Sequence, residues 1–130
     1  MSSFKKHIEM AIKREPHLCR YGIGLWCFDE HKLLTSGERF KQSQKELFNE
    51  EKTFLLCVKW LAAQRTIKKP QKSSYFYKHV VERCYKTYIP NGAFIAALIY
   101  MDIKYTYQQG PNVYAHLSKK LNLYDGVPVA

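Results

Sequence analysis

The sequence predicts one compact, mainly α-helical domain of five or six helices that spans residues 1–130. Three observations lead to this prediction. With 46% apolar and 15% aromatic residues, a chain of 130 residues can bury a substantial core. Apolar residues recur at helical spacing in several segments. Two further segments, 54–64 and 93–101, are apolar on almost every side, as expected of helices at the centre of a domain.

The N-terminal residues predict an amphipathic helix. Ser2 or Ser3 can cap this helix, and Pro16 ends it. The following segment 21–28 is apolar but contains two glycines, which favours a strand or an extended buried segment over a helix. Paired with the alternating run 104–107, it would supply one short β pair.

The middle of the chain predicts two helices separated by a break. Thr35 or Ser36 can cap the first of them. A continuous helix over 36–65 would be longer than most helices of globular proteins, so we favour a break near Asn49. The second helix then supplies the apolar segment 54–64.

A basic loop precedes the next predicted helix. Either residue of the serine pair 73–74 can cap a helix that starts near Tyr75. Lys78, Glu82 and Lys86 follow one another at i, i+4 spacing on the side opposite to the apolar face of this helix. We therefore expect these three side chains to face solvent.

A Pro-Asn-Gly turn separates this helix from the buried segment 93–101, with Asn91 as the expected helix cap. A DNA-reading helix needs polar side chains that reach base edges, and the segment 93–101 has none beyond one tyrosine hydroxyl. Any nucleic acid would therefore contact the basic face of the 75–86 helix and the 65–72 loop, with the 93–101 helix buried behind them. Asn112 is the expected cap of a last short helix that ends at Ser118 or Leu121.

The positive charge of the chain is concentrated beside these helices. The formal net charge is +10, and residues 59–86 contain eight basic residues and one acid, Glu82. A local excess interleaved with aromatic residues is typical of a nucleic-acid-binding surface, although it also suits an acidic protein partner or an anionic membrane, and many charge runs are only solvated faces. The candidate nucleic-acid-binding residues are Arg65, Lys68, Lys69, Lys72, Tyr75, Lys78, His79, Arg83 and Lys86.

Tyrosines are concentrated in the second half of the chain, where eight of the ten lie between Tyr75 and Tyr114. If Tyr75, Tyr105 or Tyr107 were exposed, these rings would build a platform on which nucleobases stack. A tyrosine-rich core with hydroxyls at its rim is the commoner arrangement.

The sequence identifies no complete catalytic or metal site. His79 and Glu82, spaced i and i+3 on one helix, have the chemistry of a metal-ligand pair or of a base and its orienting group, but no third ligand lies near them. The acidic pairs 29–30 and 50–51 make a magnesium-dependent nuclease a minor alternative. The four cysteines lack a CxxC spacing, which is typical of reduced thiols. We expect no enzymatic activity, no metal and no cofactor.

No targeting or membrane-spanning segment is predicted. The N-terminus carries lysines but no apolar h-region. The longest apolar run, 93–101, would span about 14 Å as a helix, against roughly 30 Å for a bilayer core. We expect a cytoplasmic protein without a membrane partner.

One group of residues forms a pattern between 60 and 115. It consists of Ser74-Tyr75, Lys78-His79, Glu82, the run from Asn91 to Ala97, and Pro111-Asn112. This pattern resembles one in small uncharacterised proteins carried by bacterial plasmids and phages. The resemblance implies a bacterial cytosolic setting and either nucleic-acid handling or inhibition of a host nucleic-acid machine.

The sequence thus predicts a small basic protein that binds DNA or RNA through a Lys/Arg-aromatic surface around residues 65–86. The alternative is a protein–protein adaptor or inhibitor that docks on a nucleic-acid-associated protein. Both hypotheses use the same surface, because aromatic and arginine side chains also dominate protein interfaces.

Overall fold

The computed structural model describes residues 2–107 and 110–121. This part of the chain forms five helices and three antiparallel pairs of short strands. The helices are α1 (Ser2–Arg14), α2 (Gly37–Leu47), α3 (Glu51–Ala62), α4 (Ser74–Tyr85) and α5 (Asn91–Tyr100). The strands are β1 (Leu18–Cys19), β2 (Gly22–Ile23), β3 (Leu25–Cys27), β4 (Lys32–Leu34), β5 (Tyr105–Tyr107) and β6 (Val113–Ala115). The mainly α-helical prediction is confirmed, with more β structure than the one pair expected.

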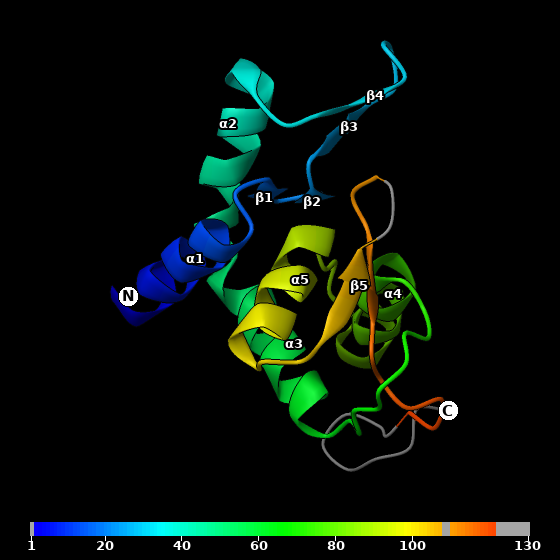
Figure 1. The fold of residues 1–130 in the computed structure, drawn as a ribbon. Coiled ribbons are helices and arrows are strands. Elements are labelled where there is room, and N and C mark those ends of the chain that lie inside the picture. Colours follow the sequence, from blue (N-terminus) through cyan, green and yellow to red (C-terminus); the bar gives the residue numbers. More distant parts are fainter. Residues whose placement is uncertain (1, 108–109, 122–130) are drawn as a thin grey trace.

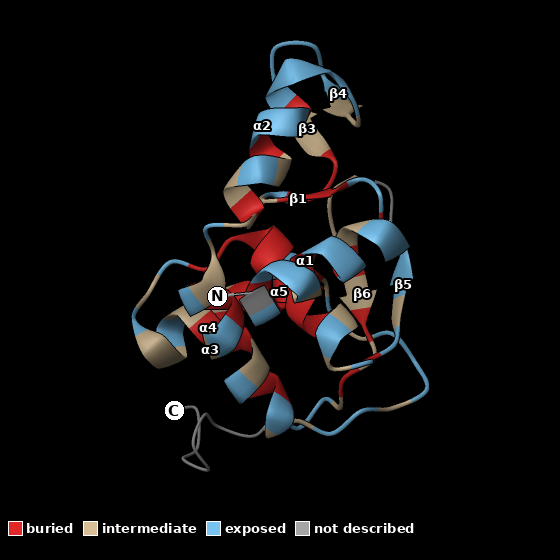
Figure 2. Cartoon of the chain, turned by 90° about the vertical axis from the view of Figure 1, so that its left-hand side faces the viewer, coloured by how far each residue is buried: buried red, intermediate tan, exposed pale blue. Residues whose placement is uncertain are grey.

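Helix α5 lies at the centre of the fold, with α1, α3 and α4 packed against it (Figures 1 and 2). Its residues from Asn91 to Leu98 are all buried, as expected of a segment that is apolar on every side. Trp60 of α3 and Tyr77 of α4 pack on Phe94 of α5, with ring centroids 6.3 and 6.0 Å apart. Both predicted central segments therefore belong to the core.

The strands pair with their neighbours in sequence. Strand β1 pairs with β2, β3 with β4, and β5 with β6. The predicted pairing of 21–28 with 104–107 is therefore wrong, because each segment finds a closer partner and a short hairpin loop costs less chain entropy to close. The β3–β4 hairpin and α2 form the upper part of the molecule in Figure 1.

Local signals placed most helix boundaries correctly. The break near Asn49 is confirmed, since α2 ends at Leu47 and α3 begins at Glu51. The serine cap of α4 is also confirmed, because the Ser73 side chain accepts a hydrogen bond from the Phe76 N–H at 3.1 Å. Among the described helices, none has the length and apolar character needed to cross a bilayer.

Two asparagine predictions are wrong. Asn91 is the first residue of α5 and not its cap, which is Pro90. Its amide donates instead to the carbonyl oxygens of Tyr21 and Pro111, so a long-range contact replaces the local one. Asn112 starts no helix, because the residues after it form β6 and pair with β5.

Candidate functional site

The loop between α3 and α4 carries four of the candidate cations. Backbone hydrogen bonds join this loop to residues 115–118, at the end of β6 and just after it. The Ile67 N–H donates to the His116 carbonyl at 2.9 Å, and the Ser118 N–H donates to the Arg65 carbonyl at 2.8 Å. Backbone bonds of this kind hold a loop that has little regular secondary structure of its own. The basic side chains of the loop therefore project from a defined frame.

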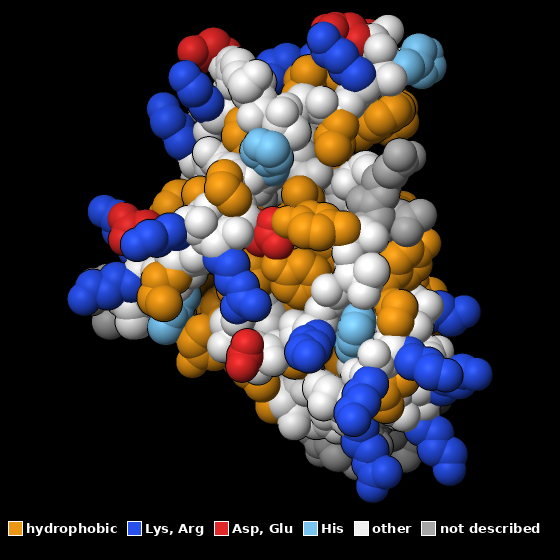
Figure 3. Space-filling view, viewed as in Figure 1, with side chains coloured by type: hydrophobic (Ala, Val, Ile, Leu, Met, Phe, Trp, Pro, Cys, Tyr) orange, Lys and Arg blue, Asp and Glu red, His pale blue; other side chains and the backbone are white. Residues whose placement is uncertain are grey.

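This pairing gathers cations from three parts of the chain. Lys68 and Lys104 line one hollow, and Lys72 and Lys119 line another. We call the exposed set the basic surface. It consists of Arg65, Lys68, Lys69, Lys72, Lys104, Lys119 and Lys120. Lysine and arginine side chains gather in this region, at the lower right of Figure 3.

Three members of the basic surface were missed by the sequence prediction. All three lie far from the loop in sequence. Lys119 and Lys120 follow the segment 115–118 that pairs with the loop, and Lys104 is joined to the same segment, because the His116 N–H donates to the Lys104 carbonyl at 3.0 Å. The adjacent Lys119-Lys120 pair was the one available signal, but it fell at the end of a segment expected to be helical. Asp102 is the acidic side chain that lines the hollow between Lys68 and Lys104.

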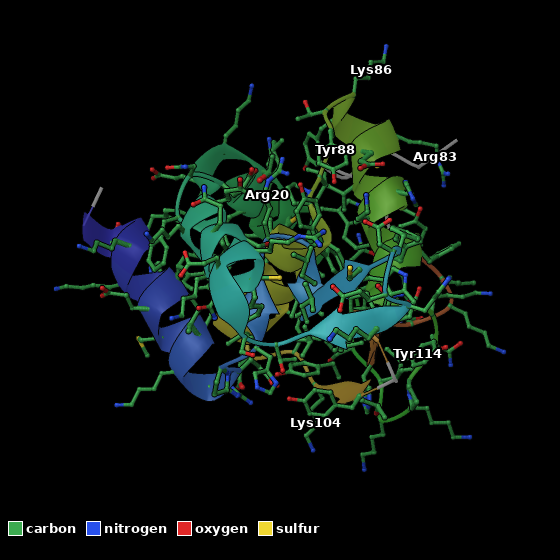
Figure 4. The ribbon with its side chains drawn as sticks, turned by 90° about the horizontal axis from the view of Figure 1, so that it is seen from above. Arg20, Arg83, Lys86, Tyr88, Lys104 and Tyr114 are labelled. Atoms are coloured by element: carbon green, nitrogen blue, oxygen red, sulfur yellow. The ribbon has the colours of Figure 1, made fainter. Side chains whose placement is uncertain are left out.

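Arg83 and Lys86 lie at the other end of α4. At 1.5 Å per residue, Lys86 is roughly 20 Å from Lys72 along the helix axis. In Figure 4 Arg83 and Lys86 project outward from α4, whereas Lys104 projects from the opposite edge of the molecule. The predicted cations are thus divided between two ends of α4, and the basic surface contains those at its N-terminal end.

Lys78 does not face solvent, contrary to the sequence-based expectation. It is only 4% exposed, and its Nζ lies 3.0 Å from Glu82 Oε2. The rings of Tyr75 and Tyr88 cover it, with centroids 5.3 and 4.7 Å from Nζ. Tyr88 belongs to the segment after α4, and helical periodicity does not reveal which segment folds back over a helix face. Lys78 is therefore an internal cation.

Glu82 accepts hydrogen bonds from three groups. Besides Lys78, they are the Ile89 N–H at 2.9 Å and His79 Nδ1 at 2.6 Å. Burial opposes ionisation of Glu82, but the Ile89 N–H, Lys78 and His79 together outweigh it and hold the pKa of Glu82 below its ordinary value. The ionised carboxylate balances Lys78 and orients the His79 ring through Nδ1, so Nε2 points away from Glu82.

Aromatic rings from four parts of the chain surround a cleft of about 530 Å³ beside Lys78. The rings are those of Tyr21, Trp26, Phe28, Tyr75 and Tyr88, and we call this site the aromatic cleft. Phe28 is 78% exposed, and Tyr75 and Tyr88 are each 53% exposed. A contiguous exposed group of large rings is a common mark of an interaction site.

A second cation supports the cleft from the side of α3. The Arg20 guanidinium lies over the rings of Tyr21 and Tyr88, at 5.2 and 5.7 Å from their centroids. Its Nε is held by Glu50 Oε2 at 2.9 Å. Figure 4 shows Arg20 and Tyr88 on the same side of the molecule. Because each cation is itself fixed by a carboxylate, the rings that it contacts are held in place as well.

Two asparagines line the cleft and tie its segments together. Asn91 Nδ2 donates to Asn112 Oδ1 at 2.9 Å and to the carbonyls of Tyr21 and Pro111, both at 3.3 Å. Asn91 Oδ1 is buried and has no partner within the described part of the chain. Six residues of the pattern that carries the resemblance meet here, since Tyr75, Lys78, His79, Asn91, Pro111 and Asn112 all line the cleft.

Two other tyrosines form a separate cluster. The hydroxyls of Tyr105 and Tyr107 both donate to the buried carboxylate of Glu15, and we call these three residues the Glu15 cluster. Burial, together with the hydrogen bond and charge of Glu15, raises the pKa of Tyr105 and raises that of Tyr107 to about 12. Of the three tyrosines proposed as a platform, Tyr75 and Tyr107 are exposed, but only Tyr75 lines the cleft.

The described residues contain no group of three histidine, cysteine or acidic side chains that is arranged to hold a metal ion. All four cysteines are free thiols, and Cys19, Cys27 and Cys57 are buried. Burial raises the pKa of Cys19 and Cys57, which disfavours the reactive thiolate.

Comparisons of this chain with protein-family models, with curated proteins and with solved structures found no match.

Proposed function

We propose that this protein binds nucleic acid through the basic surface, mainly by contacts to phosphates. The observation that carries this proposal is the backbone pairing between the α3–α4 loop and residues 115–118. It gathers seven exposed cations, with Asp102 as the acid beside them. Cations on a fixed frame bind phosphates with a smaller ordering cost than cations on a mobile loop.

Binding of this kind depends steeply on salt, because each neutralised phosphate releases condensed counterions. The logarithm of affinity is expected to fall with the logarithm of salt concentration with a slope of about −0.7 to −0.9 per phosphate contacted. A fluorescence anisotropy titration with labelled single-stranded and duplex oligonucleotides, repeated at several salt concentrations, measures this slope.

Charge reversal then locates the surface. We expect Lys68→Glu/Lys69→Glu to weaken binding at least tenfold and to flatten the salt dependence. The control is Lys5→Glu/Lys6→Glu on α1, which changes the net charge equally at two exposed lysines outside the basic surface. An equal loss in both variants, or a flat salt dependence of the unmodified protein, would contradict the proposal.

A second pair tests the contribution of the tertiary fold. Lys119→Glu/Lys120→Glu is expected to weaken binding about as much as reversal in the loop, because both pairs face the same ligand. If only the loop pair mattered, the basic surface as defined by the structure would be wrong.

The rival function is an adaptor or inhibitor that docks on a protein, and the exposed rings of the aromatic cleft favour it. An affinity purification after nuclease treatment distinguishes the two. Suppose that this protein binds no oligonucleotide at low salt but co-purifies with one other protein in stoichiometric amount. That result would contradict the nucleic-acid proposal and support the rival function.

A further inference from the structure

The side chains of the aromatic cleft are held in place before any ligand binds, as expected of a preformed binding site. Its rings are fixed by contacts that do not depend on a ligand: Tyr75 packs edge-on to His79 at 4.5 Å, and Trp26 packs edge-on to Phe28 at 6.3 Å. The cations Arg20 and Lys78 are fixed by their carboxylates. Rings that are already ordered lose little entropy when a ligand binds between them.

The charges around the cleft select the class of ligand. A quaternary ammonium group or a methylated lysine would need ring faces free of other cations. Here Lys78 already lies against Tyr75 and Tyr88, and Arg20 against Tyr21 and Tyr88. A cationic ligand would therefore compete with Lys78 and Arg20 for these rings, whereas a neutral aromatic ligand would not.

Polar groups at the lining can read the edge of such a ligand. Glu82 occupies Nδ1 of His79, which leaves Nε2 for a ligand. Asn112 accepts from Asn91 through Oδ1, so its own amide N–H groups remain as donors. An imidazole nitrogen and amide donors beside aromatic rings are the groups that bind nucleobase edges while the base stacks.

The cleft and the basic surface lie next to each other along α4. Tyr75 in the first turn of α4 lines the cleft, and Lys72, two residues before the helix, belongs to the basic surface. A strand whose phosphates follow the basic surface can therefore place a base in the cleft. Bases in a duplex are stacked and paired, so only an unpaired base can enter.

We propose that the aromatic cleft binds an unpaired nucleobase, and that the protein consequently prefers single-stranded over duplex nucleic acid. This inference rests on the proposed function, which supplies the phosphate contacts. The cleft volume of about 530 Å³ falls within the range of small-molecule sites, which suits one base with its sugar better than an extended protein surface.

Nuclear magnetic resonance of the unmodified protein tests the cleft directly. The chain contains two tryptophans, Trp26 at the cleft and Trp60 in the core, so a ¹⁵N–¹H spectrum contains two indole signals. Trp26→Phe assigns them. Titration with an unlabelled oligothymidylate is expected to shift the Trp26 signal and to leave the Trp60 signal in place, whereas a blunt-ended duplex of equal charge, which has no unpaired bases, is expected to shift neither.

Variants of the cleft measure how much its rings contribute to binding affinity. Phe28→Ala and Tyr75→Ala remove exposed rings and are together expected to weaken single-strand binding roughly tenfold to a hundredfold, with duplex binding unchanged. The control is Tyr100→Ala, an exposed tyrosine on α5 that packs against His7 outside the cleft, and it is expected to bind like the unmodified protein.

The outcomes separate the two proposals. Salt-dependent binding of oligonucleotides with an unmoved Trp26 signal, and with unchanged affinity of the Phe28 and Tyr75 variants, would overturn the cleft as a base site and leave the basic surface standing. A protein that binds no oligonucleotide at low salt would overturn both.

Discussion

The aromatic cleft and the Glu15 cluster both combine tyrosines with a largely buried carboxylate, but they use the carboxylate in opposite ways. Beside the cleft, Glu82 binds a cation, an imidazole and a backbone N–H, and the nearby rings of Tyr75 and Tyr88 remain partly open to solvent. In the Glu15 cluster, the tyrosine hydroxyls themselves donate to the carboxylate. These two hydrogen bonds hold the β5–β6 hairpin against the end of α1.

The difference shows how one residue type serves two purposes in a small fold. A tyrosine whose hydroxyl is bound by a carboxylate joins two elements and no longer has that hydroxyl to offer a ligand, even where its ring is exposed, as in Tyr107. Tyr75 and Tyr88, whose rings lie against the anchored cation Lys78, keep a large part of each ring open to solvent. Experiments that disrupt each cluster in turn should therefore separate stability from binding.

The largest effect is expected where helix α5 makes its close approach to the turn between β1 and β2. A Cβ at Gly92 would lie 1.8 Å from the Cys19 carbonyl oxygen and 2.8 Å from the Arg20 carbonyl carbon. Because Gly92 is helical, alanine would otherwise favour the helix, so any loss comes from this contact. We expect Gly92→Ala to lower the free energy of unfolding by about 4 kcal/mol, measured by urea denaturation.

Gly37→Ala is the matched control for that experiment. Gly37 has a positive φ of 89°, but no atom lies within 4 Å of the position that an alanine methyl group would take, so only backbone strain of about 1 to 2 kcal/mol is expected. Equal losses in the two variants would show that the close approach of α5 to the β1–β2 turn is not what limits stability.

A smaller loss is expected when the charge of Glu82 is removed. Glu82→Gln leaves Lys78 charged, buried and without its counterion, which should cost about 3 kcal/mol near neutral pH. Because the pKa of Glu82 is lowered by folding, its contribution is present above the ordinary value of 4.5 and is lost as pH falls through the folded value. The difference between the two proteins should therefore shrink in acid, as urea midpoints across this pH range would show.

The double variant Lys78→Met/Glu82→Gln tests whether the stability lost in Glu82→Gln comes from the ion pair. Removing both partners should restore much of the stability that Glu82→Gln alone loses. If the double variant were as unstable as the sum of two single losses, the interaction between these side chains would contribute little.

The smallest effect is expected in the Glu15 cluster. Glu15→Gln weakens two hydrogen bonds to a charged acceptor and should cost about 2 kcal/mol. Both tyrosine pKa values are raised by folding, so their contribution is complete below the ordinary value of 10 and is lost as pH rises from there toward about 12 and above. The unmodified protein should lose stability in this alkaline range, and Glu15→Gln should lose less.

Oligonucleotide binding also distinguishes the aromatic cleft from the Glu15 cluster. Glu15→Gln should bind like the unmodified protein at neutral pH, because its cluster lines neither the cleft nor the basic surface. Loss of binding in a folded Glu15→Gln protein would show that the two tyrosine clusters do not have separate roles.

The sequence alone was sufficient wherever the signal was local. The start of α4 followed from the Ser73 cap, the break before α3 from helix length, and the burial of α5 from a segment without polar groups. The loop cations of the basic surface followed from the concentration of charge. Each of these conclusions depends on neighbours within a few positions, which a single sequence displays directly.

Only the tertiary structure decided which segments meet. It buried Lys78 beneath Tyr88, turned Asn91 from a helix cap into a link between Tyr21 and Pro111, and added Lys119 to the loop cations. A charged or polar side chain has the same helical periodicity whether solvent or a distant loop covers it. The sequence therefore determined the five described helices and the charge of the α3–α4 loop, whereas long-range packing determined the strand pairs, the cleft and the extent of the basic surface.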